Sequence, residues 1–201
     1  MPLRPINELI RHAREHRYAL GYFESWNLES LQGVLDAAEA TRSPIIIGFN
    51  GEFLSHSDRK LSERLQCYAE LGKAAAACAT VPCGLIFNEC SDDEWVRNAV
   101  LAGFNLVMPA DPAASYEDYR HRVAALTAFA HRYGVALEAE VGHLRRYISL
   151  VYTKLGGFSQ WPKPGLPNYS AMDVVKLFGC RKSFASKGIE YVFGVLIKVF
   201  C

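Results

Sequence analysis

Polar side chains able to do chemistry gather where the apolar runs of the sequence end. Asn or an acidic residue follows each of five such runs: Glu24 and Asn27, Asn50 and Glu52, Asn88 and Glu89, Asp111, and finally Glu138 and Glu140. Carboxylates can exchange a proton or ligate a metal ion, whereas an amide can hydrogen-bond a polar ligand but cannot titrate. This set therefore favours a small polar ligand, with proton transfer or metal binding as the chemistry.

Helical and strand-like patterns alternate over the first part of the chain and would position these side chains. We expect helices over 5–16, 28–38, 59–79, 92–101 and 116–133, and strands over 18–23, 44–49, 83–87, 104–108 and 135–140. This alternation predicts an α/β fold with a parallel sheet. The strand spacing fits a (β/α)8 barrel and an open doubly wound sheet equally well, and both folds place their chemistry at the carboxyl ends of the strands.

Composition and missing motifs exclude several classes of function. The 201 residues carry a net charge of +1, and no apolar run reaches the roughly 18 residues of a membrane span. Neither a GxGxxG nor a GxxxxGK[ST] motif occurs, which disfavours the common kinds of nucleotide binding. The six cysteines form no CxxC pair, so we expect reduced thiols and a cytoplasmic protein. From the small net charge and the short apolar runs, we expect that the chain as a whole binds neither nucleic acid nor a membrane.

The charge of the chain changes sign near residue 144. Residues 1–144 hold 13 Lys and Arg against 19 Asp and Glu, whereas residues 145–201 hold 9 against 2. All six histidines lie in the first part, and six of the eight lysines lie in the second. Three interpretations stay open: a basic tail that pairs with an acidic body, a separate arm for nucleic acid or a membrane surface, or a segment foreign to the domain, as after a frameshift.

Four stretches of the chain match the motifs of one known family, in the same order. Residues 18–29 with 37–47 match its opening, 81–90 (VPCGLIFNEC) fall where it has VPVALHLDHG, 103–108 (GFNLVM) match GFTSVM, and 130–142 (AHRYGVALEAEVG) match AHxxGVxVEAELG. On these motifs the chain resembles the class II fructose- and tagatose-bisphosphate aldolases. The resemblance runs from about residue 10 to residue 144 and then ends.

This resemblance implies both a fold and a reaction. The fold is a TIM (β/α)8 barrel in which zinc holds a ketose phosphate while an Asp moves the hydroxyl proton. The reaction is reversible aldol cleavage of a ketose bisphosphate to dihydroxyacetone phosphate and an aldehyde, as in carbohydrate metabolism and glycolysis. Cleavage leaves an enediolate, whose negative charge needs a Lewis acid. The implied cofactor is zinc, the implied substrate is a small phosphorylated sugar, and a homo-oligomer is an open expectation.

The residues that would carry this chemistry depart from the family pattern. Asn88 stands at the position of the acid/base Asp, Glu89 at that of a zinc-binding His, and Ile86 at that of the first His of the motif. An amide cannot act as a general base, whereas a carboxylate can bind zinc. No histidine follows residue 144, so this chain lacks key catalytic residues of a zinc-dependent aldehyde-lyase.

Four residues are candidates for binding at the strand ends. We assign Glu89 and Glu140 as metal ligands, and Asn27 and Asn50 as substrate-binding residues. Asn88 is the candidate at the catalytic position, where it could hydrogen-bond a substrate. Structural alternatives exist, since Asn27 is also a good N-cap for the helix that follows it, and Glu89 can be a polar residue at a strand end.

The expected barrel is incomplete. A TIM barrel closes with eight strands, and five strands leave two edges of unpaired backbone groups. We therefore divide the chain into a partial aldolase-like (β/α) barrel over 1–144 and a basic tail of uncertain origin over 145–201. The predicted function is that of a truncated aldolase with impaired activity. A non-catalytic sugar-phosphate-binding barrel and a gene fragment without a function of its own stay open as alternatives.

Overall fold

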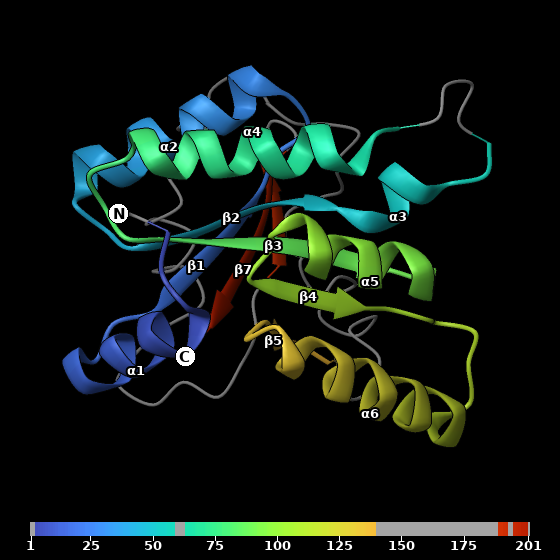
Figure 1. Ribbon diagram of the computed structural model, residues 1–201. Coiled ribbons are helices and arrows are strands. Elements are labelled where there is room, and N and C mark those ends of the chain that lie inside the picture. Colours follow the sequence, from blue (N-terminus) through green and yellow to red (C-terminus); the bar gives the residue numbers. More distant parts are fainter. Residues whose placement is uncertain (1–2, 59–62, 140–188, 193–194, 201) are drawn as a thin grey trace, which may run out of the picture.

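The chain folds into one twisted sheet with helices packed against it (Figure 1). The computed structural model describes residues 3–58, 63–139, 189–192 and 195–200. Within these ranges the strands are β1 (Leu20–Glu24), β2 (Ile45–Asn50), β3 (Cys83–Cys90), β4 (Leu106–Pro109), β5 (Ala136–Leu137), β6 (Ile189–Val192) and β7 (Val195–Phe200). The helices are α1 (Ile6–His16), α2 (Leu28–Thr41), α3 (Gly51–Ser55), α4 (Leu65–Cys78), α5 (Asp93–Ala102) and α6 (Tyr116–Arg132).

The sheet confirms the predicted α/β architecture. Its strand order is β5-β4-β3-β2-β1-β7-β6, and β1 to β5 are parallel neighbours. One expected helix differs in its bounds: of the stretch expected over 59–79, residues 59–62 lie outside the described residues, residues 63–64 are not helical, and α4 begins at Leu65. The short helix α3 precedes it, since the Asn50 side chain accepts a hydrogen bond from the Phe53 backbone and starts a turn directly after β2. No helix in the described ranges is long and apolar enough to cross a membrane.

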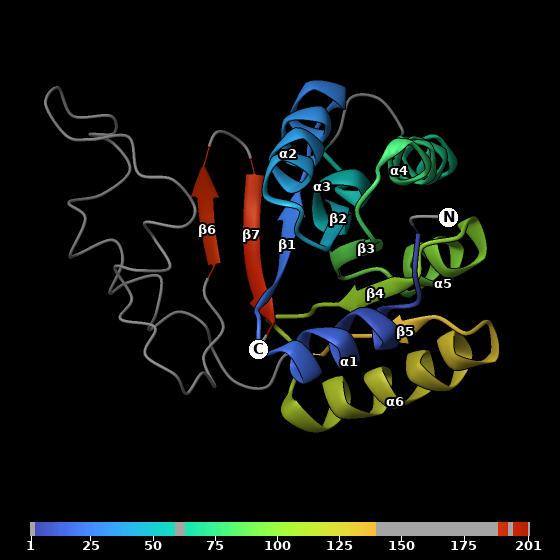
Figure 2. The same ribbon diagram turned by 90° about the vertical axis from the view of Figure 1, so that its left-hand side faces the viewer.

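The edge of β1 is paired, which corrects the expectation of two open edges. β7 lies antiparallel to β1, with Ile197 opposite Phe23, and β6 pairs in turn with β7. Figure 2 shows β7 beside β1 with β6 outside it. The expectation counted only the strands of the first 144 residues, whereas the largely apolar run at 195–200 supplies backbone donors and acceptors to this edge.

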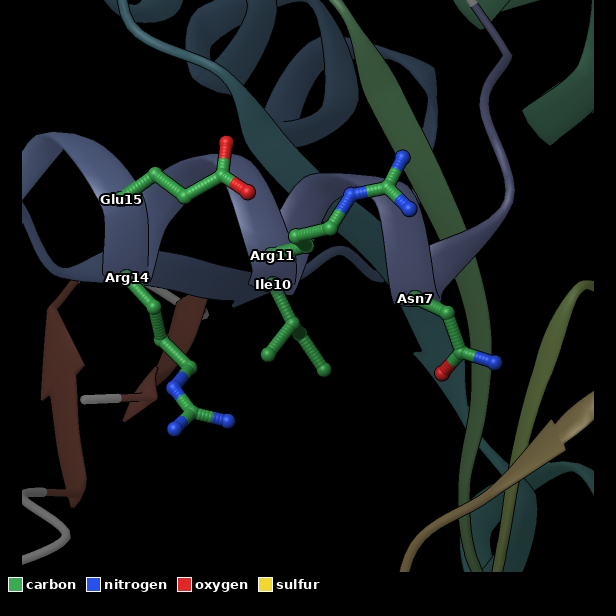
Figure 3. A pocket seen from close by; sticks show the side chains of 5 residues that line it. All are labelled: Asn7, Ile10, Arg11, Arg14 and Glu15. Carbon is green, nitrogen blue, oxygen red and sulfur yellow. The ribbon is translucent and has the colours of Figure 1, made fainter.

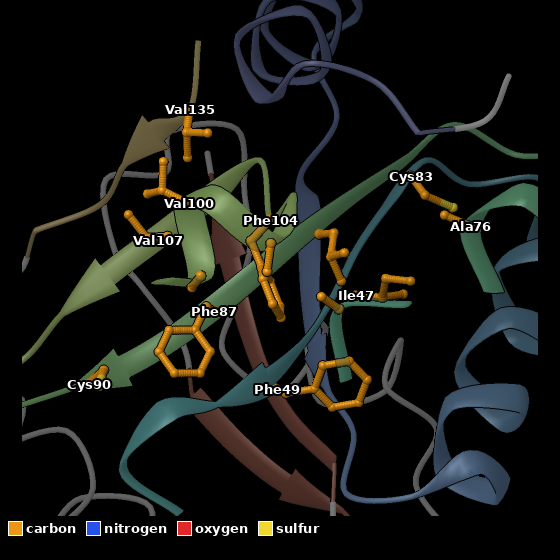
Figure 4. Close-up of a cluster of buried hydrophobic side chains, with 14 of the residues drawn as sticks. Ile47, Phe49, Ala76, Cys83, Phe87, Cys90, Val100, Phe104, Val107 and Val135 are labelled. Atoms are coloured by element: carbon orange, nitrogen blue, oxygen red, sulfur yellow. The ribbon is translucent and has the colours of Figure 1, made fainter. Parts of the chain in front are cut away.

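Two apolar clusters lie on opposite faces of the sheet. The larger cluster joins the strands to α2, α4, α5 and α6, and Figure 4 shows Phe49, Phe87 and Phe104 in its middle. The smaller cluster joins the inner face of the strands to α1 through Ile6 and Leu9. Since helices cover both faces of the sheet, the central strands are continuous runs of buried, largely apolar residues and do not alternate between apolar and polar residues.

Helix caps fix the loops that leave the carboxyl ends of the strands. The Asn27 side chain accepts from the Ser30 amide at 2.8 Å and completes a capping box with Ser30. The Asp92 carboxylate accepts from the first amides of α5, and Ser115 caps α6 in the same way. These caps confirm the helix starts expected at Asn27 and Asp92, and they hold each strand end close to the helix that follows it.

Candidate functional site

The inward-facing side chains of three strands change from apolar to polar toward the carboxyl ends. They run from Tyr22 to Glu24 on β1, from Ile46 to Asn50 on β2, and from Ile86 to Asn88 on β3. Residues two apart in a strand share a face, and Asn50 lies directly opposite Asn88 in the parallel pair. The strand ends therefore enclose a buried polar cluster above an apolar inner core.

Glu24 is the centre of this cluster. Its Oε2 accepts hydrogen bonds from Tyr22 Oη at 2.8 Å, from Asn50 Nδ2 at 3.1 Å and from Asn88 Nδ2 at 3.1 Å. Glu24 and Asn88 are fully buried, and Asn50 is 5% exposed. One carboxylate oxygen thus ties the ends of β1, β2 and β3 together.

Burial dominates the acidity of Glu24. It raises the pKa of the Glu24 carboxyl from 4.5 to about 7, because a charge is costly away from water. The hydrogen bonds from Tyr22, Asn88 and Asn50 oppose this shift, and the nearby Glu89 adds to it. Burial, followed by the charge of Glu24, also raises the pKa of Tyr22 well above its ordinary value. Glu24 therefore changes its protonation state near neutral pH and Tyr22 stays a neutral donor.

Glu89 has a strained backbone at the end of β3. Its φ is 53°, in the left-handed region, and the register between β3 and β4 shifts between Phe87 and Cys90. Among the described non-glycine residues, the other two with positive φ close helices. The half-buried Glu89 places Oε2 3.5 Å from Asn50 Nδ2. Such strain in a residue that closes no helix is common at functional sites.

Arg122 holds the loops that border the cluster. Its guanidinium donates to the carbonyl oxygens of Cys90 at 3.0 Å, Ser91 at 2.8 Å and Ala110 at 3.1 Å, and it also pairs with Asp93. These contacts join the ends of β3 and β4 to the start of α5. Arg122 is therefore a positioning residue for this edge of the sheet rather than a cation open to a ligand.

The structure brings together two of the residues assigned from sequence as catalytic or substrate-binding, together with the assigned ligand Glu89. Asn50 and Asn88 both contact Glu24, and Glu89 lies next to Asn50. Asn27 is exposed and its side chain caps α2, so its substrate-binding role stays a prediction. Glu140 lies outside the described residues.

Sequence reasoning missed the central role of Glu24. It placed Glu24 at a strand end but assigned it no function. The available signal was its spacing, because Glu24 follows the apolar Tyr22 by two residues and so shares its buried face. An acidic residue on a face that is otherwise apolar is unusual unless it is paired or functional.

Zinc does not fit the described part of the chain. No group of three or more His, Cys, Asp or Glu side chains within it could hold a metal ion. The groups that converge on Glu24 are a phenol and two amide nitrogens, which donate hydrogens and would face a cation unfavourably. The implied zinc site is thus not formed by these residues.

A surface hollow lies against α1 and is separate from this cluster. Asn7, Ile10, Arg11, Arg14 and Glu15 line it, and Figure 3 shows Ile10 and Arg14 on the same side of the helix. None of the polar residues at the strand ends lines this hollow. It therefore adds nothing to the candidate site.

Comparison with known proteins identifies a family. The family described as fructose-bisphosphate aldolase class-II matches residues 4–154, past the change of charge at residue 144. A probable fructose-bisphosphate aldolase of Bacillus subtilis is 32% identical over 145 residues, which are 71% of this chain and 49% of that protein. The fructose-bisphosphate aldolase of Giardia intestinalis is 30% identical over 72% of this chain and 43% of its own length.

A solved structure agrees with the sequence comparisons. The YdjI aldolase of Escherichia coli superposes with a TM-score of 0.61 at 30% identity, over 70% of this chain and 52% of that one. The five parallel strands are consistent with part of a TIM-barrel-like aldolase fold. The chain spans about half the length of the curated relatives it matches.

Proposed function

Since the chain belongs to the class-II fructose-bisphosphate aldolase family, we propose that it binds a small phosphorylated ketose at the carboxyl ends of β1 to β3. The family's reaction, the aldol cleavage of a ketose bisphosphate to dihydroxyacetone phosphate and an aldehyde, is impaired in this chain. The curated relatives named fructose-bisphosphate aldolase support the substrate class. The polar strand ends supply hydrogen-bonding groups of the kind that hold hydroxylated ligands.

The contact between Asn88 and Glu24 carries this proposal. Asn88 stands where the family motif has its acid/base Asp, and it is fully buried with its amide nitrogen 3.1 Å from Glu24 Oε2. An amide has no proton to exchange at neutral pH, so position 88 cannot take the proton of a substrate hydroxyl. Hydrogen bonding of a ligand remains within its chemistry.

The proposal includes a cytoplasmic location and allows a homo-oligomer. Four cysteines of the described ranges, two exposed and two buried, are free thiols, which agrees with a reducing compartment. Burial raises the pKa of both buried thiols, Cys83 and Cys90, to about 11. They therefore stay protonated and suit a packing role rather than nucleophilic catalysis.

Ligand binding, metal content and turnover measured on one preparation test this function. The full chain is incubated with a zinc salt and dialysed, and bound zinc, calorimetric binding of fructose 1,6-bisphosphate and fructose 1-phosphate, and release of triose phosphate are then measured. We expect binding of at least one sugar phosphate without stoichiometric zinc and with little release. Stoichiometric zinc together with steady turnover would contradict the proposed impairment, and failure of both sugar phosphates to bind would contradict the proposed ligand class.

The raised pKa of the Glu24 carboxyl favours a second candidate function, an aldolase that uses Glu24 as its base. A carboxyl with a pKa of about 7 can take up a hydroxyl proton near neutral pH. If this candidate is right, triose phosphate release rises with pH through about 7 in the natural chain, and Glu24→Gln abolishes it. Release that is equal in both proteins excludes Glu24 as that base.

A further inference from the structure

The two oxygens of the Glu24 carboxylate have very different surroundings. All three donors described above converge on Oε2, whereas Oε1 is buried and has no hydrogen-bond partner in the described part of the chain. Buried carboxylate oxygens are nearly always hydrogen-bonded, because an unpaired one loses its hydration without compensation. One acceptor of the cluster is therefore buried without a hydrogen-bond partner in the described part of the chain.

Two more unpartnered polar atoms follow directly in the sequence. Ser25 Oγ and Trp26 Nε1 are both buried and, within the described residues, have no hydrogen-bond partner. Trp26 is held by an edge-to-face contact with Phe53 of α3, with ring centroids 4.2 Å apart. The end of β1 thus offers an acceptor at Glu24, a donor and acceptor at Ser25, and a donor at Trp26 in three consecutive residues.

This combination matches hydroxyl groups better than a phosphate. A hydroxyl can donate to a carboxylate and accept from an indole N–H, and it suits Glu24 in either protonation state. A phosphate dianion only accepts, so it can meet Oε1 only when Glu24 is protonated. Glu89 adds negative charge beside Glu24, and its effect on the Glu24 pKa is that of a nearby like charge.

We infer that the end of β1 is a subsite for the unphosphorylated, hydroxyl-bearing end of the sugar. This inference rests on the proposed function and narrows its class of ligand. Glu24 is the specificity-determining residue of this subsite, through the unpartnered Oε1. The ligand of this chain is therefore a ketose monophosphate whose other end carries free hydroxyl groups, and a second phosphate at that end is rejected.

Calorimetric titration of the full chain with two sugars tests this subsite. We expect fructose 1-phosphate to bind about tenfold more tightly than fructose 1,6-bisphosphate, and Glu24→Gln to reduce that preference to about twofold or less. Glu29→Gln is the matched control, because it removes a negative charge from an exposed side chain in the first turn of α2 and should keep the full preference. Equal or tighter binding of the bisphosphate to the natural chain, or an unchanged preference in Glu24→Gln, overturns the inference.

A second measurement separates this inference from the proposed function. If neither sugar phosphate binds, the proposed function fails, and the subsite is then tested with erythritol and inorganic phosphate alone. The indole N–H resonance of Trp26, assigned by its loss in Trp26→Phe, should shift with erythritol and not with inorganic phosphate. No shift with erythritol, or a shift with inorganic phosphate, contradicts a hydroxyl-selective subsite.

Discussion

The amide nitrogen of Asn88 lies 3.1 Å from Glu24 Oε2, although the two residues are 64 positions apart and sit on strands separated by β2. Asn50 of the intervening strand donates to the same oxygen at 3.1 Å. The carboxylate is therefore shared by three strands, and a change at any of these positions alters both the fold and the candidate site.

The stability of the protein should depend on pH through Glu24. Folding raises the pKa of this carboxyl from 4.5 to about 7, so the folded chain binds the proton more tightly than the unfolded chain. The contribution of the Glu24 carboxyl to the free energy of unfolding is complete below about pH 4.5 and is lost as the pH rises through about 7. The loss is of the order of 3 kcal/mol.

Denaturant unfolding of the natural chain and of Glu24→Gln at about pH 5 and about pH 8 measures this loss. The free energy of unfolding of the natural chain should fall relative to that of Glu24→Gln as the pH rises. Glu15→Gln on the exposed face of α1 serves as the control and should follow the natural chain at both values. A pH-independent difference between the natural chain and Glu24→Gln would show that Glu24 titrates alike in both states.

Asn88→Asp should weaken the protein instead of restoring a family-like site. The variant places a second buried carboxyl within hydrogen-bonding distance of Glu24 and removes a donor from it. Two adjacent carboxylates cannot both ionise cheaply, so we expect a loss of about 2–4 kcal/mol above neutral pH and a smaller loss in acid, where the pair can share a proton. Urea unfolding in acid and above neutral pH checks this expectation, and Asn7→Asp at an exposed position is the control. An Asn88→Asp variant that is as stable as the natural chain above neutral pH would contradict it.

The backbone at Glu89 should accept glycine. Its φ of 53° costs an L-residue roughly 1–2 kcal/mol of backbone strain, a cost that is absent for glycine. Part of that gain is offset by the greater freedom of glycine in the unfolded chain, so Glu89→Gly should be neutral or stabilising by up to about 1 kcal/mol. The exposed Glu94→Gly in α5, where the helix favours other residues, should instead lose about 1 kcal/mol. If both variants lose the same free energy in thermal or urea unfolding, the backbone at Glu89 is not strained.

The sequence was sufficient for the helices and strands that have a strong local pattern. β2 and α5 follow from an unbroken β-branched run and from an acidic first turn, both of which act over a few residues. α3 could not be predicted in this way, because it depends on a cap from Asn50. This residue ends β2, and its side chain accepts a hydrogen bond from the Phe53 amide of the helix. The pairing of β7 with β1 could not be predicted either, since nothing local specifies a partner so far along the chain.

The residues of the candidate site also differ in whether a local pattern predicts them. Asn50, Asn88 and Glu89 could be predicted because each ends a recognisable strand. The spacing from Tyr22 indicates only that Glu24 is buried. Its central role could not be predicted, since two of its three donors, Asn50 and Asn88, lie 26 and 64 positions away and only the sheet order brings them to it. The charge on a buried carboxyl is thus a property of the fold rather than of the local sequence.

Gly48 should tolerate no side chain, because it provides the room that lets β2 pass close to β3 beneath the polar cluster. A Cβ at this position would lie 2.2 Å from the carbonyl oxygen and 2.4 Å from Cγ2 of Ile86. Backbone cannot move aside as a flexible side chain can, so Gly48→Ala should cost about 3 kcal/mol or more in denaturant unfolding. Gly33→Ala is the matched control, since a Cβ there meets nothing within 4 Å and the site is inside α2. It should gain about 1 kcal/mol from helix propensity, and a Gly48→Ala variant that unfolds like the natural chain would refute the close approach of the two strands.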